Sequence, residues 1–455
     1  MNPAGAGPDQ GLGIGRFLRL SRDPLGFLTA LRQHGTFVRY RLGPRTLHLV
    51  SDPEIVHEVL VANAAAFHKD RGTEMMRPLL GRGLLTSEDE QHRRQRRALQ
   101  PAFHKARVAD YAKVMAEEAL LARDALPDGK EVDLLSLAMR TTFAIVGRAL
   151  FGADVARHAP EVQRALADAM SVFTLARVPV YRLLLVLPLP STLRFARARD
   201  TLEAVVDRIV REHGASGFFS LAEAAGLSGD ELRDTALTLL LAGHETTAVA
   251  LCWTLYLLSQ HPAVEARLES EIDSTLQGRA PRPSDLALLP YLQRVLSESM
   301  RLFPPAWAVG RLAQRDVELS GGIVRRGETV VLSQWVIHRD PALWPDPLRF
   351  DPDRFERPAV HRFAYFPFGA GPRVCIGDGF AWTELVLLLA ALAQKFRFHL
   401  AAGQRIEPSP RVTLRLKYGL RMIPLRRSAG GNARQAATGS GSSGSGSSSS
   451  TGSQW

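Results

Sequence analysis

Apolar and polar positions along the chain follow two different periods, which separate a helical majority from a smaller β portion. Apolar residues recur every three or four positions over most of the stretch between residues 53 and 303, and again after residue 378. This period is typical of helices packed against a core, and Ser, Asp, Gly and Pro mark several of the ends. Helices are predicted at 88–99, 111–125, 132–151, 200–212, 230–260, 263–276, 291–303 and 379–396, and another begins after Ser51-Asp52-Pro53.

Short runs of β-forming residues lie near both ends of the chain. Strands are predicted at 311–317, 323–324, 329–333, 412–416 and 420–423, and two more flank the turn Gly43-Pro44-Arg45 between residues 36 and 50. Because the strands come from both ends, one interleaved domain fits better than the three domains that this length would allow. We therefore expect a mainly α fold with a small β portion, in a single domain.

The two ends of the chain differ in composition from the rest. Residues 1–15 are rich in Gly and Pro and lack the charged head and apolar run of a secretory signal. Of the 28 residues from Ser428 to Trp455, 17 are Gly or Ser. Such a segment can bury too little apolar surface to offset the conformational entropy lost when a chain becomes ordered. We expect a flexible N-terminus at 1–15, a folded domain at 16–427 and a disordered tail at 428–455. No membrane anchor is predicted, so we expect a soluble, cytoplasmic protein.

Charge and cysteine content narrow the possible functions. The net charge is +11, and 51 of the 57 basic residues are Arg. No basic run is interleaved with aromatic residues, so a solvated basic face or a docking surface for an acidic partner fits better than nucleic acid. The two cysteines, Cys252 and Cys375, exclude a disulfide framework and any site that needs about four thiolates.

A cysteine in a glycine-rich loop, directly before an apolar helix, is the sharpest local pattern. In the segment from Phe368 to Gly377, backbone N–H groups and the helix dipole favour a thiolate at Cys375. The glycines allow a flat ligand to approach the backbone. The guanidinium group of Arg373 can donate two parallel hydrogen bonds to a carboxylate. A lone thiolate is one way to hold haem iron, whereas a buried, inert cysteine near a helix cap is the alternative.

Three other polar patterns lie within predicted helices. Ala242-Gly243-His244-Glu245-Thr246-Thr247 lies inside the long apolar helix, where such residues favour either a functional site or a kink. Glu298 and Arg301 share one helix face, a pairing that is common and weak on its own. The run from His92 to Arg97 fits a solvated basic face or a nucleic-acid contact.

Taken in their order along the chain, these segments resemble the cytochrome P-450 superfamily from about Phe17 to Arg426. The cysteine loop matches F-x-x-G-x-R-x-C-x-G, the segment inside the long helix matches [AG]-G-x-[DE]-T-[TS], and an E-x-x-R helix is followed by a P-[ED]-R-F-like segment. The matching positions are Phe368, Gly371, Arg373, Cys375, Gly377, Ala242, Gly243, Glu245, Thr246, Thr247, Glu298, Arg301 and Arg354.

The resemblance implies a role for each matched residue. Cys375 would ligate the iron, with Phe368 packed beside its sulfur. Thr246 would hydrogen-bond dioxygen, and Glu245 would help relay protons. The haem propionates would be held by Arg373, His92, Arg96 and Arg311; Glu298, Arg301 and Arg354 would form a buried structural network; and Ala242, Trp307 and Val309 would line the substrate pocket.

The chemistry that the resemblance implies is insertion of one atom of dioxygen into a hydrophobic small molecule at haem b. Electrons would come from NAD(P)H through a separate ferredoxin or flavodoxin and its reductase, and we expect a monomer. The runs at 22–28, 92–101 and 301–311 look like bacterial terpene hydroxylases of the pentalenene-oxygenase kind, with fatty acids and polyketides as competing substrates. A haem-thiolate peroxygenase or isomerase is the alternative, and a nucleic-acid-binding protein without haem is a distant one.

Overall fold

The computed structural model describes residues 14–155, 158–172, 189–213, 217–357, 359 and 361–427. The predicted flexible N-terminus, apart from residues 14 and 15, and the predicted Gly/Ser tail both lie outside these residues.

Helices make up most of the described chain. They are α1 (Ile14–Arg22), α2 (Pro24–Arg32), α3 (Pro53–His57), α4 (Arg71–Glu74), α5 (Arg77–Leu80), α6 (Asp89–Leu99), α7 (Lys105–Asp124), α8 (Leu134–Phe151), α9 (Ala159–Val172), α11 (Pro190–His213), α12 (Gly217–Ala224), α13 (Gly229–Gln260), α14 (Pro262–Leu276), α15 (Pro290–Leu302), α16 (Gln334–Ile337) and α17 (Asp378–Lys395).

The strands form small sheets in which distant parts of the chain pair. They are β1 (Phe37–Leu42), β2 (Arg45–Val50), β3 (Phe67–Lys69), β4 (Val132–Asp133), β5 (Val309–Ala313), β6 (Val317–Leu319), β7 (Gly322–Val324), β8 (Thr329–Leu332), β9 (Phe396–Leu400), β10 (Pro408–Pro410), β11 (Leu414–Leu416) and β12 (Arg421–Arg426). The largest sheet has the order β1-β2-β8-β5-β3, and a second has the order β4-β12-β9. The predicted interleaving is therefore present, since strands from both ends share sheets.

Most predicted elements are found, with shifted ends. The hairpin forms β1 and β2, and α13, α14, α15 and α17 lie within two residues of prediction. The helix predicted at 132–151 begins at Leu134 instead, because Val132 and Asp133 pair with β12 as β4. The helix predicted at 200–212 begins ten residues earlier, at Pro190, and the run predicted at 311–317 divides into β5 and β6.

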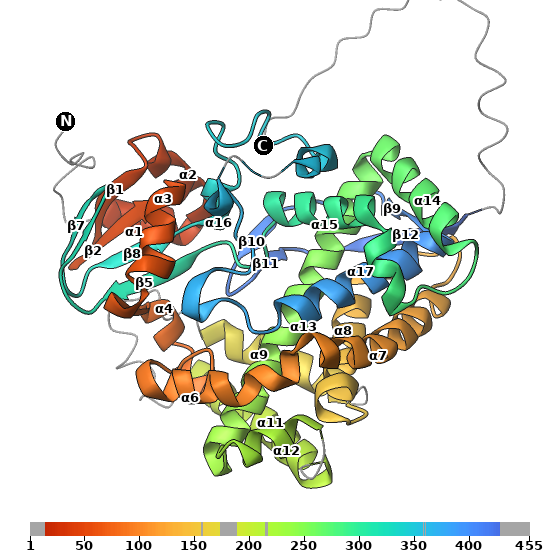
Figure 1. The fold of residues 1–455 in the computed structure, drawn as a ribbon, viewed down its shortest axis with the longest axis horizontal. Coiled ribbons are helices and arrows are strands. Elements are labelled where there is room, and N and C mark those ends of the chain that lie inside the picture. The colour runs from red at the N-terminus through yellow and green to blue at the C-terminus, as the bar shows by residue number, and fades with distance from the viewer. Residues whose placement is uncertain are drawn as a thin grey trace, which may run out of the picture.

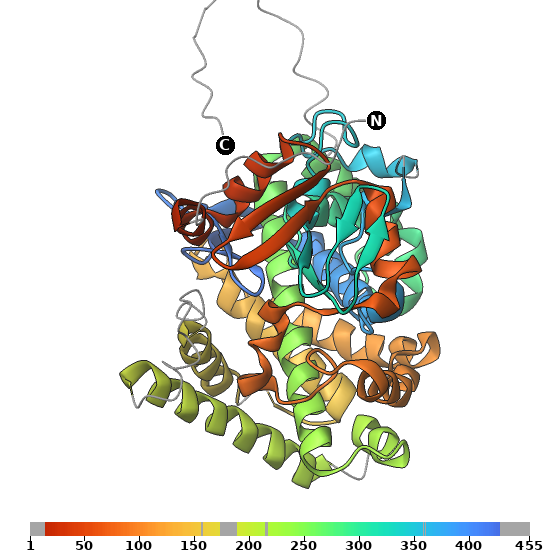
Figure 2. The ribbon, with the colours of Figure 1, turned by 90° about the vertical axis from the view of Figure 1, so that its left-hand side faces the viewer.

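Helix α13 runs through the middle of the molecule, with the five-stranded sheet on one side and the other long helices on the other (Figures 1 and 2). By length and composition alone α8 and α13 could cross a membrane, but most of each is buried inside the structure. Both are thus core helices. Leu and Val side chains of α8, α13, α15 and α17 fill the main hydrophobic cluster between them.

The irregular segment between α16 and α17 is attached to α15 by a buried ionic network. Glu298 and Arg301 are fully buried and joined by two hydrogen bonds, Nε to Oε2 at 2.7 Å and Nη2 to Oε1 at 2.8 Å. Arg301 Nη1 donates to the carbonyls of His338 and Pro347, both at 2.7 Å. Arg354 Nε donates to Glu298 Oε1 at 2.9 Å. The network supplies fixed hydrogen-bond partners to the segment between α16 and α17, whose described residues form no β-strand.

Replacing Glu298 by Gln should destabilise the fold strongly. The substitution keeps the shape but leaves two guanidinium groups near a buried amide, and breaking a buried pair typically costs about 3–5 kcal/mol. Urea denaturation should show this loss in the free energy of unfolding.

Glu356→Gln is the matched control for this loss. Glu356 pairs with Arg294 at 2.6 Å but is exposed, so its loss should cost less than about 1 kcal/mol. Equal losses for the two variants would contradict a special role for the Glu298 network.

Candidate functional site

The loop before α17 holds Cys375 by short backbone contacts. The Cys375 N–H donates to the Phe368 carbonyl at 2.9 Å, which closes the loop, and the Gly377 N–H donates to the sulfur. Gly371 has a φ of +70°, and a Cβ there would collide with the Leu60 carbonyl. The sequence predicted that the glycines let a flat ligand approach, but Gly371 is required because the neighbouring backbone occupies that space.

The Cys375 side chain is accessible although protein surrounds it. The residue counts as exposed, yet burial raises the pKa of its thiol to about 11. Burial outweighs the Gly377 hydrogen bond in its effect on this pKa. Coordination to a metal ion deprotonates such a thiol outright.

Part of the α13 segment at residues 242–247 is also accessible. Ala242 is exposed and Thr246 is half-buried, although most of the helix around them is buried. These positions are four residues apart and share one helix face. The Thr246 hydroxyl donates to the Ala242 carbonyl at 2.8 Å, an i−4 bond that loosens the helix locally. His244 points away and is buried against Phe143, so it is packed rather than solvated.

Glu245 is held by a strand that the sequence did not connect with it. Arg415, on β11, donates from Nε to Oε1 at 2.7 Å and from Nη2 to Oε2 at 2.6 Å. The Thr413 hydroxyl donates to the same Oε1. Burial raises the pKa of this carboxyl, but Arg415 and Thr413 together lower it below its usual value, so Glu245 is ionised near neutral pH.

A cluster of cations lies where strand β5 meets strand β3. Lys69 and Arg311 are register partners across the two strands, and Arg373 and His92 face the same region. Burial, followed by repulsion from Arg373 and Arg311, lowers the pKa of Lys69 to about 7. Burial and the nearby cations also lower the pKa of His92 to about 4 and that of Arg311 to about 10. The sequence did not identify Lys69 as part of this group.

Glu88 is the carboxylate that partly offsets this positive charge. Its Oε2 accepts from Arg373 Nη2 at 2.7 Å, and its Oε1 accepts from the Lys69 N–H at 2.5 Å. Asp70 also acts on Arg311, but its carboxylate and that of Glu88 leave the pKa of Arg311 below its usual value, so a ligand with two carboxylates would relieve the remaining repulsion. The residues present therefore fit haem, with the Cys375 sulfur for iron and this cluster for the propionates.

Arg96 and the predicted pocket residues occupy different surroundings. Arg96 Nη1 donates to the Val374 carbonyl at 2.7 Å, so this side chain connects α6 with the cysteine loop. Trp307 donates from Nε1 to the Arg411 carbonyl at 2.9 Å and packs against the apolar cluster around β1 and β2. Val309 begins β5 and is half-buried.

Comparison with known proteins agrees with this arrangement. The sequence model of the cytochrome P-450 family matches residues 6–422. Cyclooctatin synthase from Streptomyces melanosporofaciens is 42% identical over 90% of this chain and 93% of its own length. Pentalenene oxygenase from Streptomyces avermitilis is 34% identical over 94% of this chain and 97% of its own length. The expected likeness to bacterial terpene hydroxylases is confirmed.

A solved structure supports the fold as well. A cytochrome P-450 from Thermus thermophilus superposes with a TM-score of 0.73 at 29% identity, over 89% of this chain and 98% of that one. The family uses haem b, dioxygen and NAD(P)H-derived electrons, which excludes the nucleic-acid-binding alternative as the main function. The chain belongs to the cytochrome P-450 family and is a monooxygenase.

Proposed function

We propose that this monooxygenase oxygenates a terpenoid. The single observation that carries the proposal is the set of relatives named for cyclooctatin, cyclooctat-9-en-7-ol and pentalenene, each matching more than four-fifths of the chain. The open face of α13 is compatible, since Ala242 offers only a methyl group there. Leu85, an exposed apolar side chain, lies in a segment attached to α13 by the Arg82 N–H to Asp234 Oδ2 bond at 2.7 Å.

The residues around Cys375 and Ala242 would hold the cofactor and the substrate next to each other. Cys375 would ligate iron, and Arg311, Arg373, His92 and Lys69 would face the propionates. Bound haem supplies the activation of dioxygen, assisted by electron density from the thiolate. Trp307 and Val309 remain proposed pocket residues, and they lie just before and at the start of β5.

Protons would reach the proposed reaction site through Glu245 and Thr246. Glu245 is ionised, so it can accept a proton from solvent and pass it on, but Arg415 holds both of its oxygens. Release of one of those bonds would let the carboxyl turn toward the open face. Thr246 would hold dioxygen by a hydrogen bond, exchanging its bond to the Ala242 carbonyl for it.

The electron donor is proposed to be a separate acidic protein, a ferredoxin or flavodoxin. Helix α6 carries three basic side chains that could attract it, Arg93, Arg94 and Arg97. Two of them are already paired, Arg93 with Glu90 at 2.8 Å and Arg94 with Glu231 at 2.6 Å. Arg97 is exposed on the same helix and is the better candidate. A cytoplasmic location and a monomeric state remain part of the proposal.

Spectral titration should separate the substrate classes. Addition of cyclic terpene hydrocarbons or alcohols to the haem-loaded protein should shift the Soret band as water leaves the iron. Fatty acids and linear polyketides of equal carbon number are the matched controls and should bind more weakly. Tighter binding of a fatty acid would contradict the terpenoid assignment.

Replacing Cys375 by Ala should abolish the red-shifted Soret band of the reduced carbon monoxide complex, because that band requires a thiolate ligand. Cys252→Ala is the control, since Cys252 is buried within α13 and burial raises the pKa of its thiol. If the Cys375 variant kept the band, the ligand assignment would be wrong.

Arg415→Gln should move the acid limb of the pH profile for product formation to higher pH. Arg415 holds the pKa of Glu245 below its usual value, and burial would raise that pKa once the cation is gone. Glu245 would then become protonated, and lose its relay function, at a higher pH than in the parent protein.

Lys417→Gln is the control for Arg415, because Lys417 pairs with Glu407 just beyond the same strand. Its acid limb should stay in place. An Arg415 variant that loses activity equally at every pH would point to a structural role only.

A further inference from the structure

Gln95 of α6 is a fully buried amide that joins three parts of the chain. Its Nε2 donates to the Arg82 carbonyl at 2.7 Å and to Glu231 Oε1, in the first turn of α13, at 2.8 Å. Its Oε1 accepts the Ser87 hydroxyl at 2.6 Å. Arg82 and Ser87 belong to the α5–α6 connection, residues 81–88, which contains no helix or strand. A buried amide with these bonds made holds its partners in one arrangement.

The α5–α6 connection depends on side chains for its position. Its backbone has no ladder, so side chains bond its carbonyls instead. Gln95 bonds that of Arg82, and Lys69 Nζ bonds those of Leu84 and Ser87 at 2.9 and 2.7 Å. Buried backbone groups need such partners, so the path of the connection follows from a few side chains outside it.

The connection touches α13 at two glycines. Between them, the Arg82 N–H donates to Asp234 Oδ2 at 2.7 Å. A Cβ at Gly81 would collide with the Asp234 carboxyl, and one at Gly83 would collide with the Thr238 hydroxyl and the Asp234 carbonyl. The connection therefore lies directly against α13, at a separation that leaves no room for a side chain between them.

The same face of α13 becomes accessible one turn further on. Asp234, Thr238, Ala242 and Thr246 are each four residues apart, so they form one row along the helix. Thr238 is buried beneath Gly83, whereas Ala242, about 6 Å further along the axis, is exposed. The α5–α6 connection thus borders the accessible stretch of α13 on which the proposed substrate would lie.

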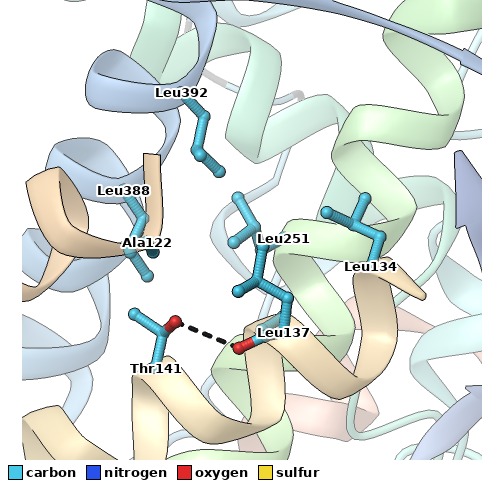
Figure 3. A pocket seen from close by; sticks show the side chains of 8 residues that line it. Ala122, Leu134, Leu137, Thr141, Leu251, Leu388 and Leu392 are labelled. Atoms are coloured by element: carbon cyan, nitrogen blue, oxygen red, sulfur yellow. Dashed lines mark hydrogen bonds between the residues drawn. The ribbon is translucent and has the colours of Figure 1, made fainter. Parts of the chain in front are cut away.

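A small apolar pocket lies on the opposite side of α13. Leu251 borders it, nine residues beyond Ala242 and hence half a turn around the helix. Figure 3 shows Leu137 of α8 and Leu388 of α17 lining the same pocket. Its volume of about 10 Å³ has room for at most one water molecule, so it cannot hold the proposed substrate.

The Gln95 amide lies between two acceptors that would otherwise repel each other. One is the Arg82 carbonyl and the other is the Glu231 carboxylate, and both accept from the same Nε2. Gln91, one turn earlier, reaches the Arg82 carbonyl only at 3.4 Å, which makes it a weak replacement. Removal of the Gln95 amide therefore favours movement of the α5–α6 connection away from α13.

We propose that Gln95 sets the size of substrate that the face of α13 at Ala242 admits, by holding the α5–α6 connection against the helix. Without the amide the connection would move outward and the space beside Ala242 would widen. Gln95 is a positioning residue, since it acts through the connection rather than on the substrate. The inference rests on the proposed function, in which the substrate lies against this face.

Replacement of Gln95 by Leu removes the amide at nearly the same volume. Soret titration of the haem-loaded protein should give a Kd for cyclic terpene alcohols raised about tenfold, since losing about one net hydrogen bond shifts an equilibrium by that factor. The Kd for an unbranched fatty acid of equal carbon number should stay the same or fall. Equal losses of affinity for both ligands would contradict a role in size selection.

Gln100→Leu is the matched control. It makes the same substitution at the C-terminal end of α6, where the side chain is exposed. Both Kd values should therefore stay at those of the parent protein. A change in ligand preference as large as that of Gln95→Leu would show that the buried amide has no special role.

Asp234→Ala tests the same contact from the α13 side. Asp234 is half-buried, so its removal takes the acceptor from the Arg82 N–H without opening the core. Ligand preference should shift in the same direction, and the double variant with Gln95→Leu should shift it little further, because both act through one segment. Asp230→Ala, at an exposed position of α13, should have no effect. Fully additive shifts would overturn the proposal.

Hydrogen exchange separates this inference from the proposed function. In the haem-loaded protein without substrate, Gln95→Leu should speed amide exchange at residues 82–87, while exchange in α17 stays as in the parent protein. Unchanged exchange at residues 82–87 would overturn the inference. If the parent protein binds no terpenoid, the proposed function fails, and the ratio of Kd values for short and long fatty acids in the Gln95 variant still decides whether Gln95 limits substrate size.

Discussion

The buried pair of Glu298 and Arg301 fixes the part of the molecule on which the cysteine loop depends. Between α16 and α17 the backbone makes few regular hydrogen bonds, so its carbonyls need partners from elsewhere. Arg301 supplies them at His338, Pro347 and Arg349, while Glu298 accepts the Asp351 N–H at 2.9 Å. One ion pair thus supplies fixed partners to the irregular segment between residues 338 and 354, which precedes the cysteine loop in the chain.

Three buried glutamates show how surroundings set the use of one side chain. Glu298 faces two guanidinium groups and has a structural role. Glu245 faces one, Arg415, and keeps its charge beside the open face of α13. Glu384 faces only a hydroxyl, so it keeps a proton instead. The fold thus places one residue type in three different electrostatic surroundings.

Local patterns predicted the long elements and the contiguous motifs, because these depend on residues close in sequence. The span of α13 and the loop from Phe368 to Gly377 are of this kind. Strands β3 and β4 were missed because two or three residues cannot show a period. The bonds from Arg415 to Glu245 and from Arg373 to Glu88 join residues 170 and 285 positions apart, so no local signal could reveal them.

The register of the five-stranded sheet concentrates positive charge where β3 meets β5. Pairing of Lys69 with Arg311 across β3 and β5 forces two cations together, and Arg373 of the cysteine loop adds a third. Their repulsion opposes folding of this sheet edge, and Glu88 offsets only part of it. A ligand with two carboxylates favours the folded edge over any state in which the cations separate. Ligand binding and the pairing of β3 with β5 are therefore thermodynamically linked, and each stabilises the other.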